Sequence, residues 1–182
     1  MSGSVGDNTA RASGVIASAG GGAILQVKSV EFTGTASNSG STPAAFTAFN
    51  IAFTPTAATS KLCLQLSLMG GSAGYRQGGY FYDSTGAAII GPIGNGSGSR
   101  QRLTFGETTT SGSECTAINF TAWFTPGDTT TRTLQVWAAA SAAGALYINK
   151  SSNDTNNDTI SYARSASTFT ITEYDGSIVT VS

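Results

Sequence analysis

The clearest pattern in the chain is a strict alternation of apolar and polar residues over positions 61–69. Four leucines recur there with a period of two, at Leu62, Leu64, Leu66 and Leu68. A helix would scatter these side chains around its axis, whereas a strand places them all on one face. The segment is therefore predicted to be a β-strand with one buried face.

Similar short apolar segments follow one another along the chain, separated by clusters of Gly, Pro, Asn, Ser and Thr. They are rich in β-branched and aromatic residues, which favour strands. The predicted strands are 23–33, 46–54, 61–69, 79–83, 87–90, 100–105, 115–125, 131–138, 146–149, 167–174 and 177–181. No segment has a convincing amphipathic helical period, and the alanine-rich stretch 138–145 is predicted to be a loop or a strand extension. About ten short strands predict an all-β fold, a jelly-roll-like β-sandwich.

Residues 1–22 differ from the rest, because they are mostly Gly, Ala and Ser. We expect an extended N-terminal anchoring arm there, followed by the sandwich domain at 23–182. Such an arm buries too little apolar surface to order itself, so we expect another chain to hold it. The candidate assembly residues are Asn8, Arg11, Val15 and Ile16, of which the last two are the apolar anchors. The alternative is that the arm packs on its own domain or inside a homo-oligomer.

Composition narrows the function. More than half of the 182 residues are Gly, Ser, Thr or Ala, only 10% are charged, the net charge is −1 and histidine is absent. Nucleic-acid binding is not expected, since phosphate contacts need clustered Lys and Arg. No apolar run approaches 18 residues, so membrane insertion is not expected either. The first 22 residues lack the apolar stretch of a signal peptide, and we expect synthesis in a cytoplasm with no encoded export route.

Few residues are placed for catalysis or metal binding. The absence of His and the distance between Cys63 and Cys115 predict no metal and no cofactor. Two buried thiols are favoured for these cysteines, with a disulfide left open. The acidic stretch 152–159 lacks the spacing of a calcium loop and is predicted to be a polar connector. Without histidine the commonest general base is missing, so we expect no enzymatic activity. An enzyme acting on cell-surface polysaccharide is the weakest alternative.

Aromatic residues are the better functional clue. The candidate surface-binding residues lie around one loop and strand, and they are Tyr75, Arg76, Tyr80 and Tyr82. Trp123 and Trp137 are further candidates for faces away from the core. Tyr, Trp and Arg are enriched at binding hot spots, and aromatic rings also stack on sugars. The competing interpretation is that about half of these side chains simply fill the second face of the sandwich.

Three stretches carry a family resemblance: ILQVKSVEF at 24–32, FTPTAATSKLCLQLSL at 53–68, and LYINKSSNDTNNDTISYARSASTFTITEY at 146–174. Together they resemble a β-rich domain of bacteriophage appendage proteins, frequent in marine phages and cyanophages and often found at the end of tail-fibre-like chains. The likeness covers roughly residues 23–174. It implies a virion structural or host-contacting role, usually as a homotrimer, and it supplies no catalytic residues.

Two features depart from that family. The chain runs past the usual final strand, and it has a short arm in place of a long shaft. A compact domain with a short arm fits a knob or cement protein better than a fibre tip. We therefore expect a non-enzymatic capsid decoration protein in the virion, anchored by its arm to other virion proteins of the capsid or tail. The alternative is a tail-fibre tip, a receptor-binding domain that contacts host surface glycans through residues 75–82 or 153–158.

Overall fold

The alternating leucines form the centre of the molecule. β5 (Lys61–Gly71) buries all four of them, while Gln65 between them is exposed. One edge of β5 pairs with β9 (Cys115–Phe124), and the other pairs with β12 (Ser167–Tyr174). β1 (Ile24–Phe32) then pairs with β12, which gives the order β1-β12-β5-β9. We call this sheet A.

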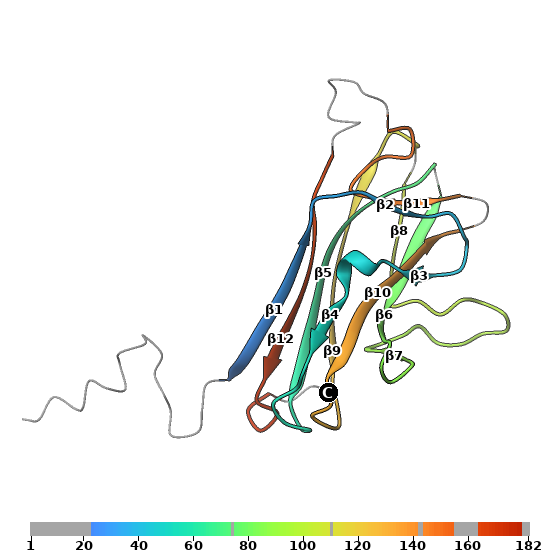
Figure 1. Ribbon diagram of the computed structural model, residues 1–182. Helices are drawn as coiled ribbons and strands as arrows, with labels where there is room; N and C mark the ends of the chain where they lie inside the picture. The colour runs from blue at the N-terminus through green and yellow to red at the C-terminus, as the bar shows by residue number, and fades with distance from the viewer. Residues whose placement is uncertain (1–22, 74, 110, 142–143, 155–163, 180–182) are drawn as a thin grey trace, which may run out of the picture.

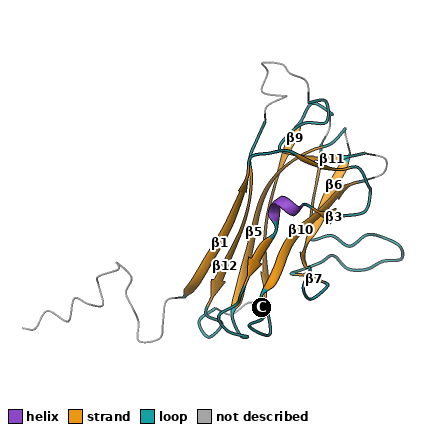
Figure 2. Cartoon of the chain, viewed as in Figure 1, coloured by secondary structure: helices purple, strands orange, loops and turns teal. Residues whose placement is uncertain are grey.

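The computed structural model describes residues 23–73, 75–109, 111–141, 144–154 and 164–179. Its second sheet, sheet B, is built on the antiparallel pair β10 (Arg132–Ala140) and β6 (Arg76–Asp83). The other edge of β10 is shared by β3 (Ala44–Ala45) and β4 (Ile51–Phe53), and the other edge of β6 by β7 (Ala88–Ile90) and β8 (Phe105–Thr108). Figures 1 and 2 show the two sheets side by side.

The strand pairs are nested, as they would be in a single long hairpin whose turn lies after β6. β1 pairs with β12, β4 with β10, β5 with β9, and β6 with β7 and β8. The first and third of these pairs lie in sheet A, and the second and fourth lie in sheet B. A hairpin rolled up in this way is a jelly roll, so the predicted fold class is confirmed. Short β11 (Leu146–Ile148) and β2 (Ala36–Asn38) extend sheet A, which brings the strands to twelve, with no α-helix in the described ranges.

Aromatic rings join the two sheets. Phe81 of sheet B stacks on Phe169 of sheet A, with ring centroids 5.5 Å apart and planes 15° from parallel. Phe105 and Phe120 pack against the same centre, each within 6.4 Å of Phe81. Packed sheets lie about 10 Å apart, a gap that these rings fill from both sides.

Three predicted strands need correction. In 46–54 only β4 is a strand, because Thr47–Phe49 form a 3₁₀ turn, η2, that puts both Phe46 and Phe49 into the core. The strand predicted over 100–105 starts only at Phe105, because the loop before it is closed by a hydrogen bond from the Gly94 N–H to the Leu103 carbonyl. In 177–181 the described residues form a turn around Asp175.

A fully buried carboxylate ties β1 to the sandwich. Glu173 on β12 is 0% exposed and pairs with no cation among the described residues. Its oxygens accept bonds from Gln26 Nε2 at 2.6 Å, from the Thr56 N–H at 2.6 Å and from the Thr56 hydroxyl at 2.9 Å. Burial alone would raise the pKa of Glu173, but the hydrogen bonds donated by Gln26 and Thr56 outweigh it and lower that pKa.

A second buried polar group fixes the opposite end of β1. Asn149 is fully buried with φ +60°, and its Nδ2 donates to the carbonyls of Phe32 at 2.6 Å and Gly34 at 2.9 Å. The Ser167 hydroxyl donates to Asn149 Oδ1 at 2.6 Å. The end of β1 is thereby linked to the start of β12.

Replacing Glu173 by Gln should destabilise the protein by about 2 kcal/mol at pH 7, because charge-assisted hydrogen bonds are lost in a buried site. The folded pKa of Glu173 is lowered, so its stabilisation is present above the unfolded pKa of about 4.3 and is lost as pH falls through the folded pKa. Urea denaturation at pH 7 and pH 3 should show that the difference in free energy of unfolding between wild type and Glu173→Gln becomes smaller at acid pH. Glu31→Gln, at an exposed position of β1, is the control and should leave stability unchanged. A gap that does not change with pH would mean that Glu173 is not ionised in the fold.

Candidate functional site

Alternation along β6 brings most of the candidate binding residues to one face. Arg76 is exposed, and Tyr80 and Tyr82 are half-buried. Phe81, between the two tyrosines, and Asp83, which follows them, are buried. Successive side chains of a strand point to opposite faces, so the first three project from the outer face of sheet B. Gly78 occupies the remaining outward position.

Trp137 of β10 joins this face. Its register partner is Tyr80, and the two rings stack at 6.0 Å and 22°. Tyr82 packs on the same indole at 4.5 Å. Trp137 Nε1 donates to Gln135 Oε1 at 2.9 Å, and Gln135 Nε2 donates to Asn50 Oδ1 at 3.1 Å, which fixes the orientation of the indole. We call Tyr80, Tyr82 and Trp137 the sheet B aromatic cluster.

A small hollow of about 160 Å³ lies farther along the β6–β10 pair, beside Gly78 and its register partner Ala139. No residue of the sheet B aromatic cluster lines it. The lining residues are Ser41, Arg76, Gln77, Gly78, Gln101, Leu103, Ala139, Ala140 and Ser141. Gln101 Nε2 donates to the Ser41 carbonyl at 3.1 Å, so two loops meet at this rim. Exposed Arg76 forms no ion pair with any residue that the structure describes.

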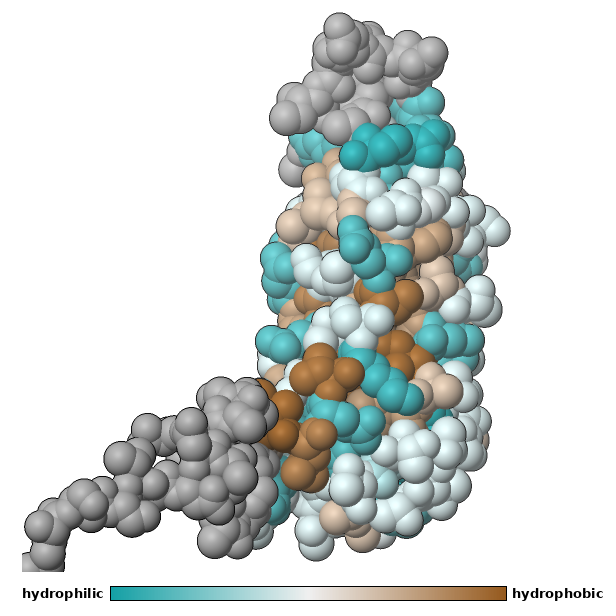
Figure 3. All heavy atoms as spheres, turned by 60° about the vertical axis from the view of Figure 1, so that its left-hand side comes forward, coloured by the Kyte–Doolittle hydropathy of each residue, from teal (hydrophilic) through white to brown (hydrophobic). Residues whose placement is uncertain are grey.

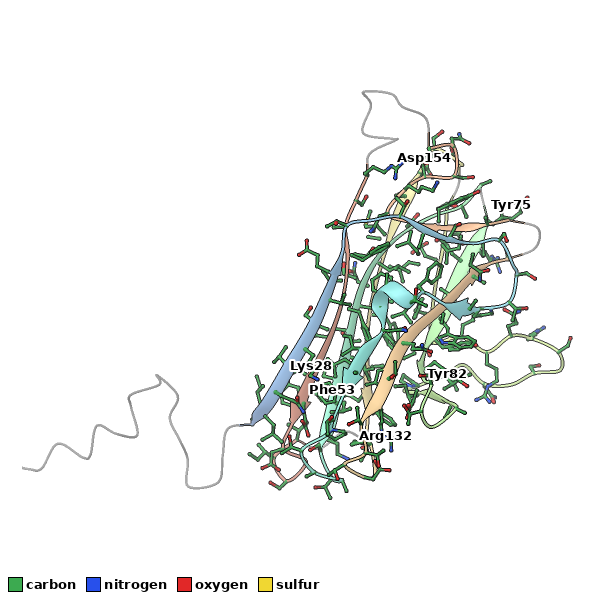
Figure 4. The ribbon with its side chains drawn as sticks, in the orientation of Figure 1. Lys28, Phe53, Tyr75, Tyr82, Arg132 and Asp154 are labelled. Atoms are coloured by element: carbon green, nitrogen blue, oxygen red, sulfur yellow. The ribbon has the colours of Figure 1, made fainter. Side chains whose placement is uncertain are left out.

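Tyr75, the fourth candidate, does not share this face. Its ring is half-buried against the core, and a Cβ on Gly144 would overlap it. Figure 4 places Tyr75 near the upper end of the molecule, apart from Tyr82. The other candidate tryptophan, Trp123, lies on sheet A, where its ring is 5.4 Å from that of Tyr174. The four assembly candidates in the arm, Asn8, Arg11, Val15 and Ile16, lie outside the described residues.

The outer face of sheet A is a second candidate surface. The most exposed large apolar side chains in this region lie at the start of β1 and after β12; they are Ile24, Leu25, Val27 and Ile178. We call these four residues the β1 apolar strip. Figure 3 shows apolar side chains gathered at this lower end. Above it, Ser, Thr, Asn and Gln side chains line a shallow hollow of about 420 Å³ across β9, β5 and β12.

The acidic groups with clear partners have structural roles. Arg132 bridges buried Asp83 and exposed Asp128, and it lies over the Phe124 ring. Asp154 accepts bonds from Lys150 at 3.0 Å and Arg164 at 2.9 Å, at the upper end of Figure 4. Across the described ranges no three His, Cys, Asp or Glu side chains gather as a metal site would require.

The two cysteines are free thiols. Cys63 is opposite Trp123 and Cys115 is opposite Gly71, so the thiols are eight positions apart along the β5–β9 ladder. At about 3.3 Å per residue this separation is near 26 Å, far beyond the reach of a disulfide. Burial raises the pKa of both thiols, and nearby Asp154 raises that of Cys115 further.

Comparison with known proteins identifies no family. No protein-family model matches the sequence, and no curated protein matches it. Among solved structures, a chain from infectious bursal disease virus, Gx strain, is similar with a TM-score of 0.39 and 11% identity, over 82% of this chain and 36% of that chain. This chain thus spans about a third of that viral chain, and at such a score the jelly-roll assignment rests on strand pairing alone. In the described part of the chain, no helix is long and apolar enough to cross a membrane.

The aromatic cluster predicts late ionisation of one tyrosine. Burial, and then the neighbouring Tyr82 phenol, raise the pKa of Tyr80. An ultraviolet titration of the phenols should therefore lose a component above the ordinary phenol pKa of about 10 in Tyr80→Phe. Because the folded pKa is raised, the stabilisation is present at lower pH and is lost as pH rises through that pKa. Tyr147→Phe is the comparison variant, and loss of the same component there would contradict the assignment.

Proposed function

We propose that this chain is a non-enzymatic structural protein of a bacteriophage particle, an oligomeric decoration protein of the capsid. The rolled-up hairpin supports the proposal, because jelly rolls are frequent in viral capsid and lectin domains. A fold alone does not determine a function, so the surface has to carry the argument. The observation that carries it is the β1 apolar strip, which leaves Ile24 and Val27 each 55% exposed.

The β1 apolar strip fits side-chain packing against a second copy of the chain. Exposed apolar patches of this kind mark protein contacts. The β1 strand is also tied to sheet B, because the Lys28 side chain donates to the Ala52 carbonyl of β4 and the Gln26 side chain to the Thr54 carbonyl just after it, both at 2.7 Å. The Lys28 ammonium also lies 5.7 Å from the centre of the Phe53 ring. Figure 4 shows these two labelled residues next to each other. Side-chain packing around a closed ring of copies is compatible with a homotrimer.

The two buried carboxylates support a structural role rather than a catalytic one. Asp83 and Glu173, both nearly inaccessible, already hold strands together through Arg132 and Gln26. A general acid or base must be free to exchange protons with a substrate. Groups committed to the fold in this way are poor candidates for that role.

Sedimentation of the purified full chain tests the oligomer. Wild type should sediment near three times 18.4 kDa. Val27→Asp combined with Ile178→Asp should shift it toward 18.4 kDa at micromolar concentration, because two charges would be buried without partners. Ile89→Asp, at an isoleucine of sheet B that is 41% exposed, is the matched control and should remain oligomeric. A monomeric wild type, or dissociation of the control alone, would contradict the proposed interface.

Deleting residues 2–22 distinguishes a capsid decoration protein from a tail-fibre tip. If the chain decorates the capsid through its arm, the deletion variant should no longer co-sediment with particles of the virus that encodes it. If the chain is a tail-fibre tip, particle binding should persist while adsorption to host cells is lost. The sheet B aromatic cluster is the specific observation that favours this second candidate, since aromatic rings serve as platforms for sugars.

A further inference from the structure

Sheet A ends in two strands that have a strand partner on one side only. Within the described ranges, β9 pairs with β5 alone and β1 pairs with β12 alone. Edge strands are usually protected by lysines, prolines or bulges. On β9 the stretch 116–125 contains no charged residue and no proline, and its register with β5 is continuous. The free edge of β9 therefore has none of the usual protections against strand pairing.

Hydrogen bonds of β5 show which backbone groups point toward β12. The Met69 N–H donates to the Ser167 hydroxyl at 2.9 Å, and the Met69 carbonyl accepts from the Asn149 N–H at 2.8 Å. Both partners lie on the side of β12 and β11. The direction of the backbone groups alternates along a strand, so Gln65, four residues earlier, also points toward β12. Its register partner there is Thr170.

The same row of the sheet ends in an outward-pointing residue on each side. Thr121 of β9 is opposite Gln65, and Ser29 of β1 is opposite Thr170. Because Gln65 and Thr170 point toward each other, the N–H and carbonyl of Thr121 point away from β5, and those of Ser29 point away from β12. Both residues are exposed, and no other described residue bonds to these backbone groups. Each free edge thus offers a donor and an acceptor at the same level.

The directions of the two edge strands suit a ring of copies. The pairs β1–β12, β12–β5 and β5–β9 are all antiparallel, so β1 and β9 run in opposite directions. Rotation about an axis along the strands preserves these directions, and it brings β9 of one copy antiparallel to β1 of the next. A contact between two different edges is head-to-tail, and it closes into a ring when the rotation closes.

The neighbouring rows bring compatible side chains together. The three registers place Val27, which is 55% exposed, level with half-buried Trp123. They also place Glu31 level with Asn119, both of which are exposed. An apolar side chain then meets an aromatic ring, and a carboxylate meets a neutral amide, so like charges do not meet across this contact.

We propose that β9 of each copy pairs antiparallel with β1 of the next, with Thr121 beside Ser29 and Trp123 beside Val27. The inference rests on the proposed oligomer, and it names the surface that the β1 apolar strip meets. Backbone hydrogen bonds between the two edges add to the burial of the apolar side chains, and sheet A continues from one copy into the next.

Cysteine cross-linking of the purified full chain tests the pairing. In a background of Cys63→Ala and Cys115→Ser, the combination of Ser29→Cys with Thr121→Cys should give disulfide-linked trimers, because residues of a hydrogen-bonded pair have Cα atoms about 5.5 Å apart. Either substitution alone should leave the chain unlinked. Ser29→Cys with Thr108→Cys, at an exposed threonine of β8 in sheet B, is the matched control and should also stay unlinked.

The possible results separate this pairing from other assemblies. Dimers linked by Thr121→Cys alone would show that β9 pairs with itself about a two-fold axis, and would overturn the proposal. A double variant that sediments as a trimer but does not cross-link would overturn it as well, while leaving the proposed oligomer intact. A monomeric wild type would contradict the proposed oligomer and this pairing together.

Opposite charges at Asn119 give an independent test. Asn119→Glu should place a carboxylate against Glu31 of the next copy and raise the trimer dissociation constant at low salt, by up to about fivefold for each contact. Asn119→Lys should not weaken the trimer, and Glu31→Lys should restore the trimer of Asn119→Glu. Thermal unfolding of each variant checks that it folds. Equal dissociation constants for Asn119→Glu and Asn119→Lys would overturn the proposed register.

Discussion

A buried carboxylate satisfied entirely by uncharged donors holds the lower end of β1 in place. The cost of burying Glu173 is offset only while Gln26 and the turn after β4 supply their hydrogen bonds. β1 needs such a link, because it is an edge strand whose residues are mostly exposed. The same link fixes the segment that carries exposed Ile24 and Val27. The proposed assembly surface thus depends on a polar interaction that is itself hidden from solvent.

The periodicity of two made most of the fold predictable. It placed the inward face of β5 correctly, and the number and spacing of strands indicated a jelly roll. It failed where tertiary contacts decide local structure. Phe46 and Phe49 both enter the core through a 3₁₀ turn, although their spacing of three residues lies inside a segment that is otherwise typical of a strand. The predicted strand near residue 100 starts only at Phe105, because β7 already occupies the same edge of β6 from Phe81 to Asp83.

The aromatic face of sheet B was only partly predictable, because strand alternation and strand register both decide which side chains share it. Tyr75 and Arg76 are neighbours in sequence, so a strand that begins at Arg76 cannot present both on the same face. Trp137 meets Tyr80 only through the β6–β10 register, which spacing along the chain does not encode. The burial of Glu173 could not be predicted from the pattern either, since a glutamate in an alternating strand is normally expected at the surface.

The two surfaces differ in the physics of their interactions. Association through Ile24, Val27 and Ile178 would be driven by apolar burial, which salt does not screen. The sheet B aromatic cluster is instead held by ring packing and by the hydrogen bonds from Trp137 to Gln135 and from Gln135 to Asn50, so its shape does not depend on a partner. With only 10% of residues charged, neither surface relies on ion pairs that salt would screen.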